Sequence, residues 1–168
     1  KVGADFAENF LLEYTEGLSM EQVGWGRISR GDLDQLMEMN TRYHDFMLRT
    51  PYWAQVAASD LAARIRDTVL AAAEGKAVPG ELGTPQDRVV LLDGHDSNLA
   101  WLGGLLRLDW ILKDQTFNAT PPGSGFVFEV HHNRRTGADS VRVFFVGQTL
   151  DQIRELRPLK GEERPSVA

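Results

Sequence analysis

The sequence contains no cysteine, so it can form no disulfide, no thiolate metal site and no cysteine nucleophile. It also lacks a long cluster of lysines or arginines, and its formal net charge is −6. A basic surface that could neutralise nucleic-acid phosphates is therefore not expected. No apolar run approaches the roughly 18 residues that cross a bilayer. We predict neither a nucleic-acid partner nor a membrane partner.

What the chain does contain is typical of one globular domain. Its 168 residues include 42% hydrophobic and 25% charged residues, enough to bury a core. Hydrophobic spacing predicts a helix near the start, a second helix that Asp32 caps and Pro51 ends, and a short helix after a capping box at Thr149. Two further helices are predicted at 51–75 and 99–106, with a buried strand between them at 89–92. Two antiparallel strands are predicted at 126–130 and 141–146.

A short polar strip interrupts two apolar segments between Asp93 and Asn98. Successive side chains of a strand point to opposite faces, so His95 and Asp96 can share one pocket only if the chain turns there. Gly94 permits such a turn, and a helix starting near Ser97 or Asn98 directs free N–H groups to the same place. This arrangement predicts an anion-binding site at the end of a buried strand.

A simpler interpretation stays open on spacing alone. Asp96 then only caps the helix, and His95 makes an ordinary hydrogen bond in a turn. Metal binding is not predicted, because no second histidine lies at ligand spacing from this strip. The other histidines are predicted to have no special role: His44 at the surface or boundary of a helix, and His131 and His132 in a solvated loop. The glycine pair at 103 and 104 predicts close packing against a strand.

Five segments together resemble one enzyme family. They are "FAENFLLEYTEGL", "GWGRI", "DGHDSNLAWLGGLL", "NATPPGSGFVFE" and "QTLDQIRELRPL". In this order they are similar to the C-terminal half of the histidine acid phosphatases, particularly the bacterial phytases and glucose-1-phosphatases. The resemblance implies the phosphoglycerate-mutase-like α/β fold, with a mixed sheet flanked by helices and a smaller helical region. Residues 1–87 would form the helical region and its return, and residues 88–168 the C-terminal part of the α/β domain.

The resemblance also implies a two-step hydrolysis of phosphomonoesters. A histidine attacks phosphorus to give a phosphohistidine, which water then hydrolyses. Asp96 matches the aspartate that protonates the leaving oxygen, and His95 matches the histidine that donates a hydrogen bond to the phosphoryl group. Ser97 and, more loosely, Glu8 match positions that contact substrate. The implied enzyme uses no cofactor and no metal, and the family suggests a periplasmic or secreted location.

One family motif is missing from this chain. The nucleophile belongs to an Arg-His-Gly motif, but none of the four histidines here follows an arginine. We therefore expect the nucleophile in an N-terminal segment or chain of the same protein, acting as a partner of this one on a phosphomonoester substrate. The predicted function is an acid phosphomonoesterase of the phytase or sugar-phosphatase type. The alternative is a non-catalytic phosphate-binding or scaffold remnant of the same fold.

Overall fold

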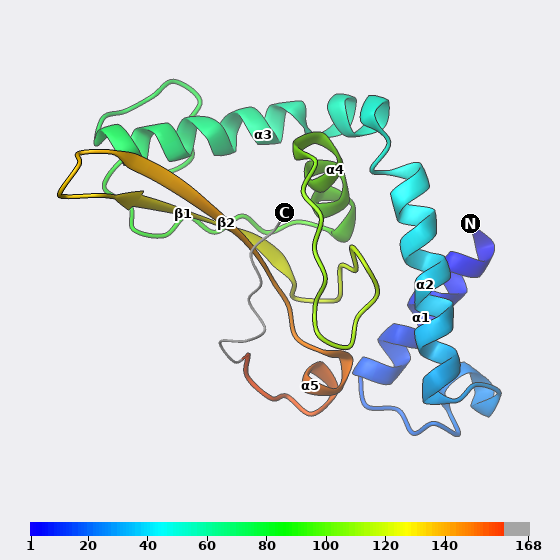
Figure 1. Ribbon diagram of the computed structural model, residues 1–168. Coiled ribbons are helices and arrows are strands. Elements are labelled where there is room, and N and C mark those ends of the chain that lie inside the picture. The colour runs from blue at the N-terminus through cyan, green and yellow to red at the C-terminus, as the bar shows by residue number, and fades with distance from the viewer. Residues whose placement is uncertain (160–168) are drawn as a thin grey trace.

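The computed structural model describes residues 1–159. Figure 1 shows α3 and a β-hairpin extending side by side toward one end, α1 and α2 together at the other, and α4 between them. A short 3-10 helix, Val23–Gly26, precedes α2. The bounds of the other elements are α1 Val2–Thr15, α2 Arg30–Met47, α3 Pro51–Glu74, α4 Asp96–Leu106, β1 Gly125–His132, β2 Asp139–Val146 and α5 Leu150–Arg154.

Capping residues explain where the long helices begin and end. The α2 cap is Ser29 rather than the predicted Asp32, which occupies the third helical position. Ser29 N–H donates to the Asp32 carboxylate at 2.8 Å, and this bond lowers the pKa of Asp32. The predicted α3 is confirmed. It starts at Pro51, where a missing N–H removes no helical hydrogen bond, and ends at a left-handed Gly75.

One hydrophobic core joins the two ends of the described chain. It is formed by Leu11, Tyr14, Val23, Leu33 and Leu150. The Tyr14 hydroxyl donates to the Asp151 carboxylate at 2.7 Å, which fixes α5 against α1. This hydrogen bond lowers the pKa of Asp151, while burial is the main cause of the raised pKa of Tyr14. The capping box predicted at Thr149 is confirmed and starts α5.

A second core joins the hairpin to α4. Trp110 stacks on Phe145 with ring centroids 4.2 Å apart, and Phe126 meets both rings edge-on. The indole N–H of Trp110 donates to the Ala119 carbonyl at 2.7 Å. The hairpin is the predicted antiparallel pair, with Gly125 opposite Val146 and His132 opposite Asp139. These contacts hold the sheet edge beside the helix that carries the polar strip.

The close packing predicted at the glycine pair occurs, but against a different partner. A Cβ on Gly104 would lie 2.6 Å from the Arg49 carbonyl oxygen and 3.0 Å from the Ala54 Cβ, so α4 packs against the α2–α3 junction rather than a strand. Arg49 reinforces this junction through Asp45 at 3.0 Å and Asp109 at 2.6 Å. Burial is the main cause of the lowered pKa of Arg49.

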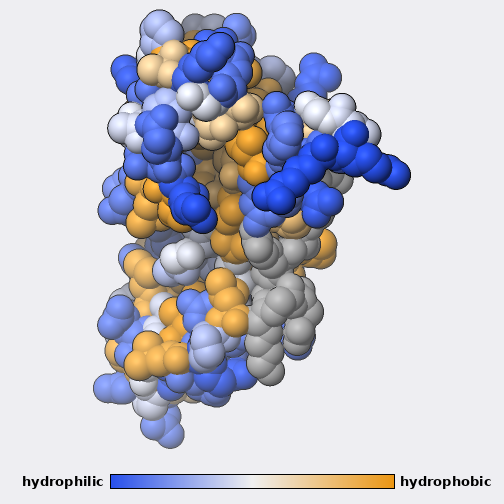
Figure 2. Space-filling view, turned by 90° about the vertical axis from the view of Figure 1, so that its left-hand side faces the viewer, coloured by the Kyte–Doolittle hydropathy of each residue, from blue (hydrophilic) through white to orange (hydrophobic). Residues whose placement is uncertain are grey.

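The predicted buried strand at 89–92 is wrong for the described chain. Those four residues form neither a strand nor a helix, and Val89 and Leu91 are 83% and 88% exposed. A buried strand needs a neighbouring strand on its edge, and the sheet of residues 1–159 contains only β1 and β2. Figure 2 views the molecule from the end where the hairpin tip lies, and other apolar side chains also reach the surface on this face.

Candidate functional site

The candidate site is built at the N-terminus of α4. His95 is the N-cap residue, with an extended backbone at φ −111° and ψ 165°, and Asp96 is the first helical residue. The backbone passes from extended to helical between His95 and Asp96, and the helix begins one or two residues before the expected start at Ser97 or Asn98. The His95 N–H donates to the Asn98 side-chain oxygen at 2.8 Å, which fixes the turn. The positive dipole end of α4 lies here, while the Ser97 N–H donates to the Asp96 carboxylate and the Asn98 N–H donates to the His95 carbonyl.

Asp96 has a different environment at each carboxylate oxygen. Its Oδ1 accepts the Ser97 backbone N–H at 2.6 Å, so Asp96 satisfies one free amide of the helix, as the simpler interpretation expected. Its Oδ2 lies 3.8 Å from Nε2 of His44 on α2, and the side chain remains 34% exposed. The carboxyl group is therefore held in place and still accessible to a molecule at the helix end.

The other predicted site residues lie in different positions relative to Asp96. His95 and Ser97 adjoin it in the chain, His95 exposed and Ser97 half-buried. Glu8 is exposed on α1 and forms no hydrogen bond or ion pair with any residue in 1–159. Helix α2 connects Glu8 on α1 with Asp96 on α4, because it packs on α1 and also contacts α4. His95, Asp96 and Ser97 are consecutive in the chain, and a shared site, with or without Glu8, stays a prediction.

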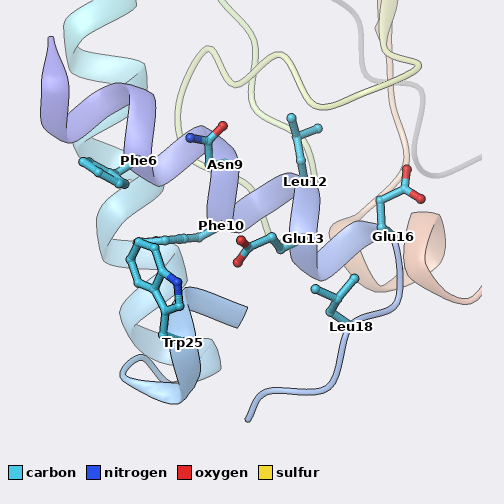
Figure 3. A pocket seen from close by; sticks show the side chains of 8 residues that line it. All are labelled: Phe6, Asn9, Phe10, Leu12, Glu13, Glu16, Leu18 and Trp25. Atoms are coloured by element: carbon cyan, nitrogen blue, oxygen red, sulfur yellow. The ribbon is translucent and has the colours of Figure 1, made fainter. Parts of the chain in front are cut away.

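Two surface cavities lie at other places. The larger one, of about 390 Å³, is lined by α1 and Trp25. Figure 3 shows Phe6, Phe10 and Trp25 beside Glu13, whose carboxylate accepts the Gly24 N–H at 2.8 Å. The second, of about 260 Å³, lies between α2 and residues 116–117. None of the predicted site residues lines either of these two cavities.

His44 is a site residue that sequence reasoning missed. Its side chain is only 14% exposed and faces Asp96 across the α2–α4 contact. The sequence predicted a surface or boundary position for His44 because this residue lies between Tyr43 and Asp45 on one helix. Because the partner is 52 positions further along the chain (96 − 44), neither periodicity nor motif spacing contains a signal for this contact.

The remaining two histidines end a strand rather than lie in a loop. His131 and His132 are the last residues of β1. His132 Nδ1 lies 2.7 Å from the carboxylate of Asp139, its cross-strand partner, and His131 Nε2 lies 3.1 Å from Glu129. The loop prediction failed because strand pairing extends two residues beyond the apolar run. Both imidazoles have carboxylate partners on the hairpin.

No trio of residues suited to holding a metal ion occurs within positions 1–159. The same part of the chain has no helix with the length and apolar composition needed to cross a membrane. The titratable groups gathered at the α4 terminus are therefore Asp96, His95 and His44, two imidazoles and one carboxyl. Such a set can donate and accept protons and can hydrogen-bond an anion at the end of a helix.

Comparisons with known proteins place these residues in a family. Residues 28–146 match the model of the histidine phosphatase superfamily, branch 2. The chain is 35% identical over 159 residues to phytase AppA of Escherichia coli K12 and 33% identical over 163 residues to glucose-1-phosphatase of Salmonella typhimurium. These alignments cover 94% and 95% of this chain but only 36% of each relative.

A solved structure shows the same fold. The Klebsiella sp. ASR1 phytase superposes with a TM-score of 0.83 at 28% identity, covering 99% of this chain and 40% of that one. The predicted α/β fold class is thereby confirmed as part of a histidine phosphatase fold. With the family model matching well over half of its length, this chain belongs to branch 2 of the histidine phosphatase superfamily.

Proposed function

We propose that this chain supplies the general acid and part of the phosphate pocket of an acid phosphomonoesterase of the phytase or sugar-phosphatase type. The observation that carries the proposal is the position of Asp96, which starts α4 with one carboxylate oxygen anchored and the side chain accessible. Membership of the family and relatives named as a phytase and a glucose-1-phosphatase support the reaction class.

In the first step a histidine outside this chain attacks phosphorus while the bond to the leaving oxygen breaks. Asp96 transfers its proton to that oxygen, so that an alcohol departs rather than an alkoxide. In the second step water attacks the phosphohistidine, and the Asp96 carboxylate accepts a proton from that water. The histidine and the protonated carboxyl are thereby both regenerated, and inorganic phosphate is released.

The helix terminus has a second task in this proposal. His95, exposed at the N-cap, donates a charge-assisted hydrogen bond from its ring to a phosphoryl oxygen. The positive end of the α4 dipole adds to this stabilisation. Ser97 offers a hydroxyl beside the same position. Glu8 is assigned to the wall that contacts the leaving group, and it reaches this wall only if the complete protein brings α1 to the site.

The nucleophile is assigned to an N-terminal segment or chain of the same protein. The chain spans 36% of the length of its curated relatives, and the exposed apolar run at 89–92 supplies an unpaired edge where further strands can add. We further propose that residues 1–87 belong to the helical region and 88–168 to the α/β domain; positions 160–168 of that range lie outside the described residues. A periplasmic or secreted location stays a prediction from the family.

Trapping the covalent intermediate tests this function. The complete protein, mixed with radiolabelled substrate in acid and quenched in alkali within one turnover, should retain one phosphoryl group per molecule. Because phosphohistidine survives alkali and is labile to acid, the chemistry of the label identifies it. Proteolytic mapping should place the label outside residues 1–168. Label on any of this chain's four histidines would contradict the proposal, and absence of label would favour the non-catalytic remnant.

A further inference from the structure

The contact between His44 and Asp96 joins two helix ends of opposite polarity. His44 lies in the last turn of α2, and its carbonyl accepts the Leu48 N–H at 2.8 Å. Asp96 is the first residue of α4. Anions are stabilised near helix N-termini, so the α4 dipole favours the carboxylate that Asp96 becomes once it has given up its proton. The 3.8 Å separation of Nε2 and Oδ2 is an electrostatic contact across the two helices rather than a hydrogen bond.

Neighbouring carboxylates do not compete for this histidine. Asp45, the next residue on α2, pairs with Arg49 at 3.0 Å, and Asp109 pairs with the same guanidinium at 2.6 Å. The Asn118 side chain also donates to Asp109 at 3.0 Å. Arg49 thus engages the two nearby acids, and Asp96 is the carboxylate that His44 faces. With only 14% of its side chain exposed, His44 is screened from water more than Asp96 is.

We infer that His44 is a positioning residue for the acid Asp96, an inference that rests on the function proposed above. The Ser97 N–H holds Oδ1, and the His44 ring faces Oδ2, so the carboxyl is constrained from both sides. When the proton passes from Asp96 to the leaving oxygen and the P–O bond breaks, the resulting carboxylate faces the His44 ring. No proton leaves His44 in this step. Its contribution is electrostatic and orienting.

The inference predicts a dependence on the leaving group. Alkyl phosphates need full protonation of the departing oxygen, whereas p-nitrophenolate leaves with little help. A residue that assists Asp96 should therefore matter for the first substrate and hardly for the second. A residue that only supports the fold should affect both substrates equally, because a loss of folded protein lowers both rates together.

The test is made in the complete protein with His44→Phe, which keeps a flat ring but removes both nitrogens. We expect kcat/KM for glycerol 2-phosphate to fall about tenfold and kcat/KM for p-nitrophenyl phosphate to fall less than about threefold, because this constant reports the step in which the leaving oxygen is protonated. KM should change little for either. His44→Gln, which retains an N–H donor without the charge, should recover part of the loss. His132→Phe is the matched control, because it removes an imidazole–carboxylate pair on the hairpin. It should leave the ratio of the rates for the two substrates unchanged.

An equal loss on both substrates, or an unchanged ratio in both His44 variants, would overturn the inference. If His44→Phe does not fold, as judged by its thermal transition, the ratio measured for His44→Gln decides alone. Asp96→Asn is measured in parallel to separate the two proposals. If Asp96→Asn lowers the rate for glycerol 2-phosphate more than the rate for p-nitrophenyl phosphate, and the His44 variants lower both equally, only the positioning role fails. If Asp96→Asn shows no discrimination, the acid function itself fails.

Discussion

Asp96→Asn in the complete protein is expected to lower kcat/KM for alkyl phosphomonoesters, which reports the first step alone, by about 10²- to 10⁴-fold, the range that a positioned general acid contributes. Asparagine has no carboxyl proton to give, so an alkoxide would have to depart unprotonated. The loss for p-nitrophenyl phosphate should be at least about tenfold smaller, because that leaving group is already a weak base. Steady-state kinetics with the two substrate classes measures both effects.

The substitution is conservative for the fold. The asparagine oxygen can still accept the Ser97 N–H that Oδ1 accepts now at 2.6 Å, so the start of α4 is retained. Asp93→Asn is the matched control, because Asp93 is an exposed acid three residues upstream that has no assigned role. It should leave both rates within about twofold of the unaltered protein, as expected for a surface substitution. A uniform loss in Asp96→Asn, or none, would remove Asp96 from the role of acid.

The second large effect concerns the apolar run at 89–92. In the isolated 168-residue chain its backbone amides should exchange with solvent nearly as fast as in an unfolded peptide, because no backbone hydrogen bond from these residues occurs in the described structure. In the complete protein we expect exchange to slow by about a thousandfold or more, as for a central strand of a sheet. Hydrogen exchange with mass spectrometry, on both proteins under identical conditions, gives the comparison.

The hairpin provides the internal reference for that experiment. Bonded and non-bonded pairs alternate along the antiparallel ladder of β1 and β2, and the amides of the bonded pairs should be protected in both proteins. If the hairpin is protected in the isolated chain and the run at 89–92 exchanges quickly in both proteins, no strand covers it. The proposed N-terminal partner would then lose its structural support.

Local signals in the sequence predicted much of this fold correctly. Proline at the first position and glycine past the last set the bounds of α3, and a Thr-x-x-Gln box set the start of α5. A helix starting near Ser97 or Asn98 was also predicted, and α4 begins at Asp96. Each of these predictions depends on residues within four positions of one another, where backbone sterics and capping decide the structure.

Predictions failed where a partner far along the chain decides. The apolar run at 89–92 has the composition of a buried strand, but composition does not say whether an adjacent strand is present. Gly104 indicated close packing without naming Arg49 as the neighbour. His44 meets Asp96 only because α2 and α4 cross, and helix crossing depends on the packing of whole faces. The candidate acid was therefore accessible to sequence reasoning, and its imidazole neighbour was not.

The most direct test of the central claim, that the start of α4 holds an acid beside a bound phosphoryl group, is a crystal structure of the complete protein with a tetrahedral oxyanion such as tungstate. The account predicts a ring nitrogen of His95 within about 3 Å of an anion oxygen. It also predicts the Asp96 carboxyl on the side of that anion from which the leaving group departs. An anion bound elsewhere, or an Asp96 side chain directed away from it, would contradict the account.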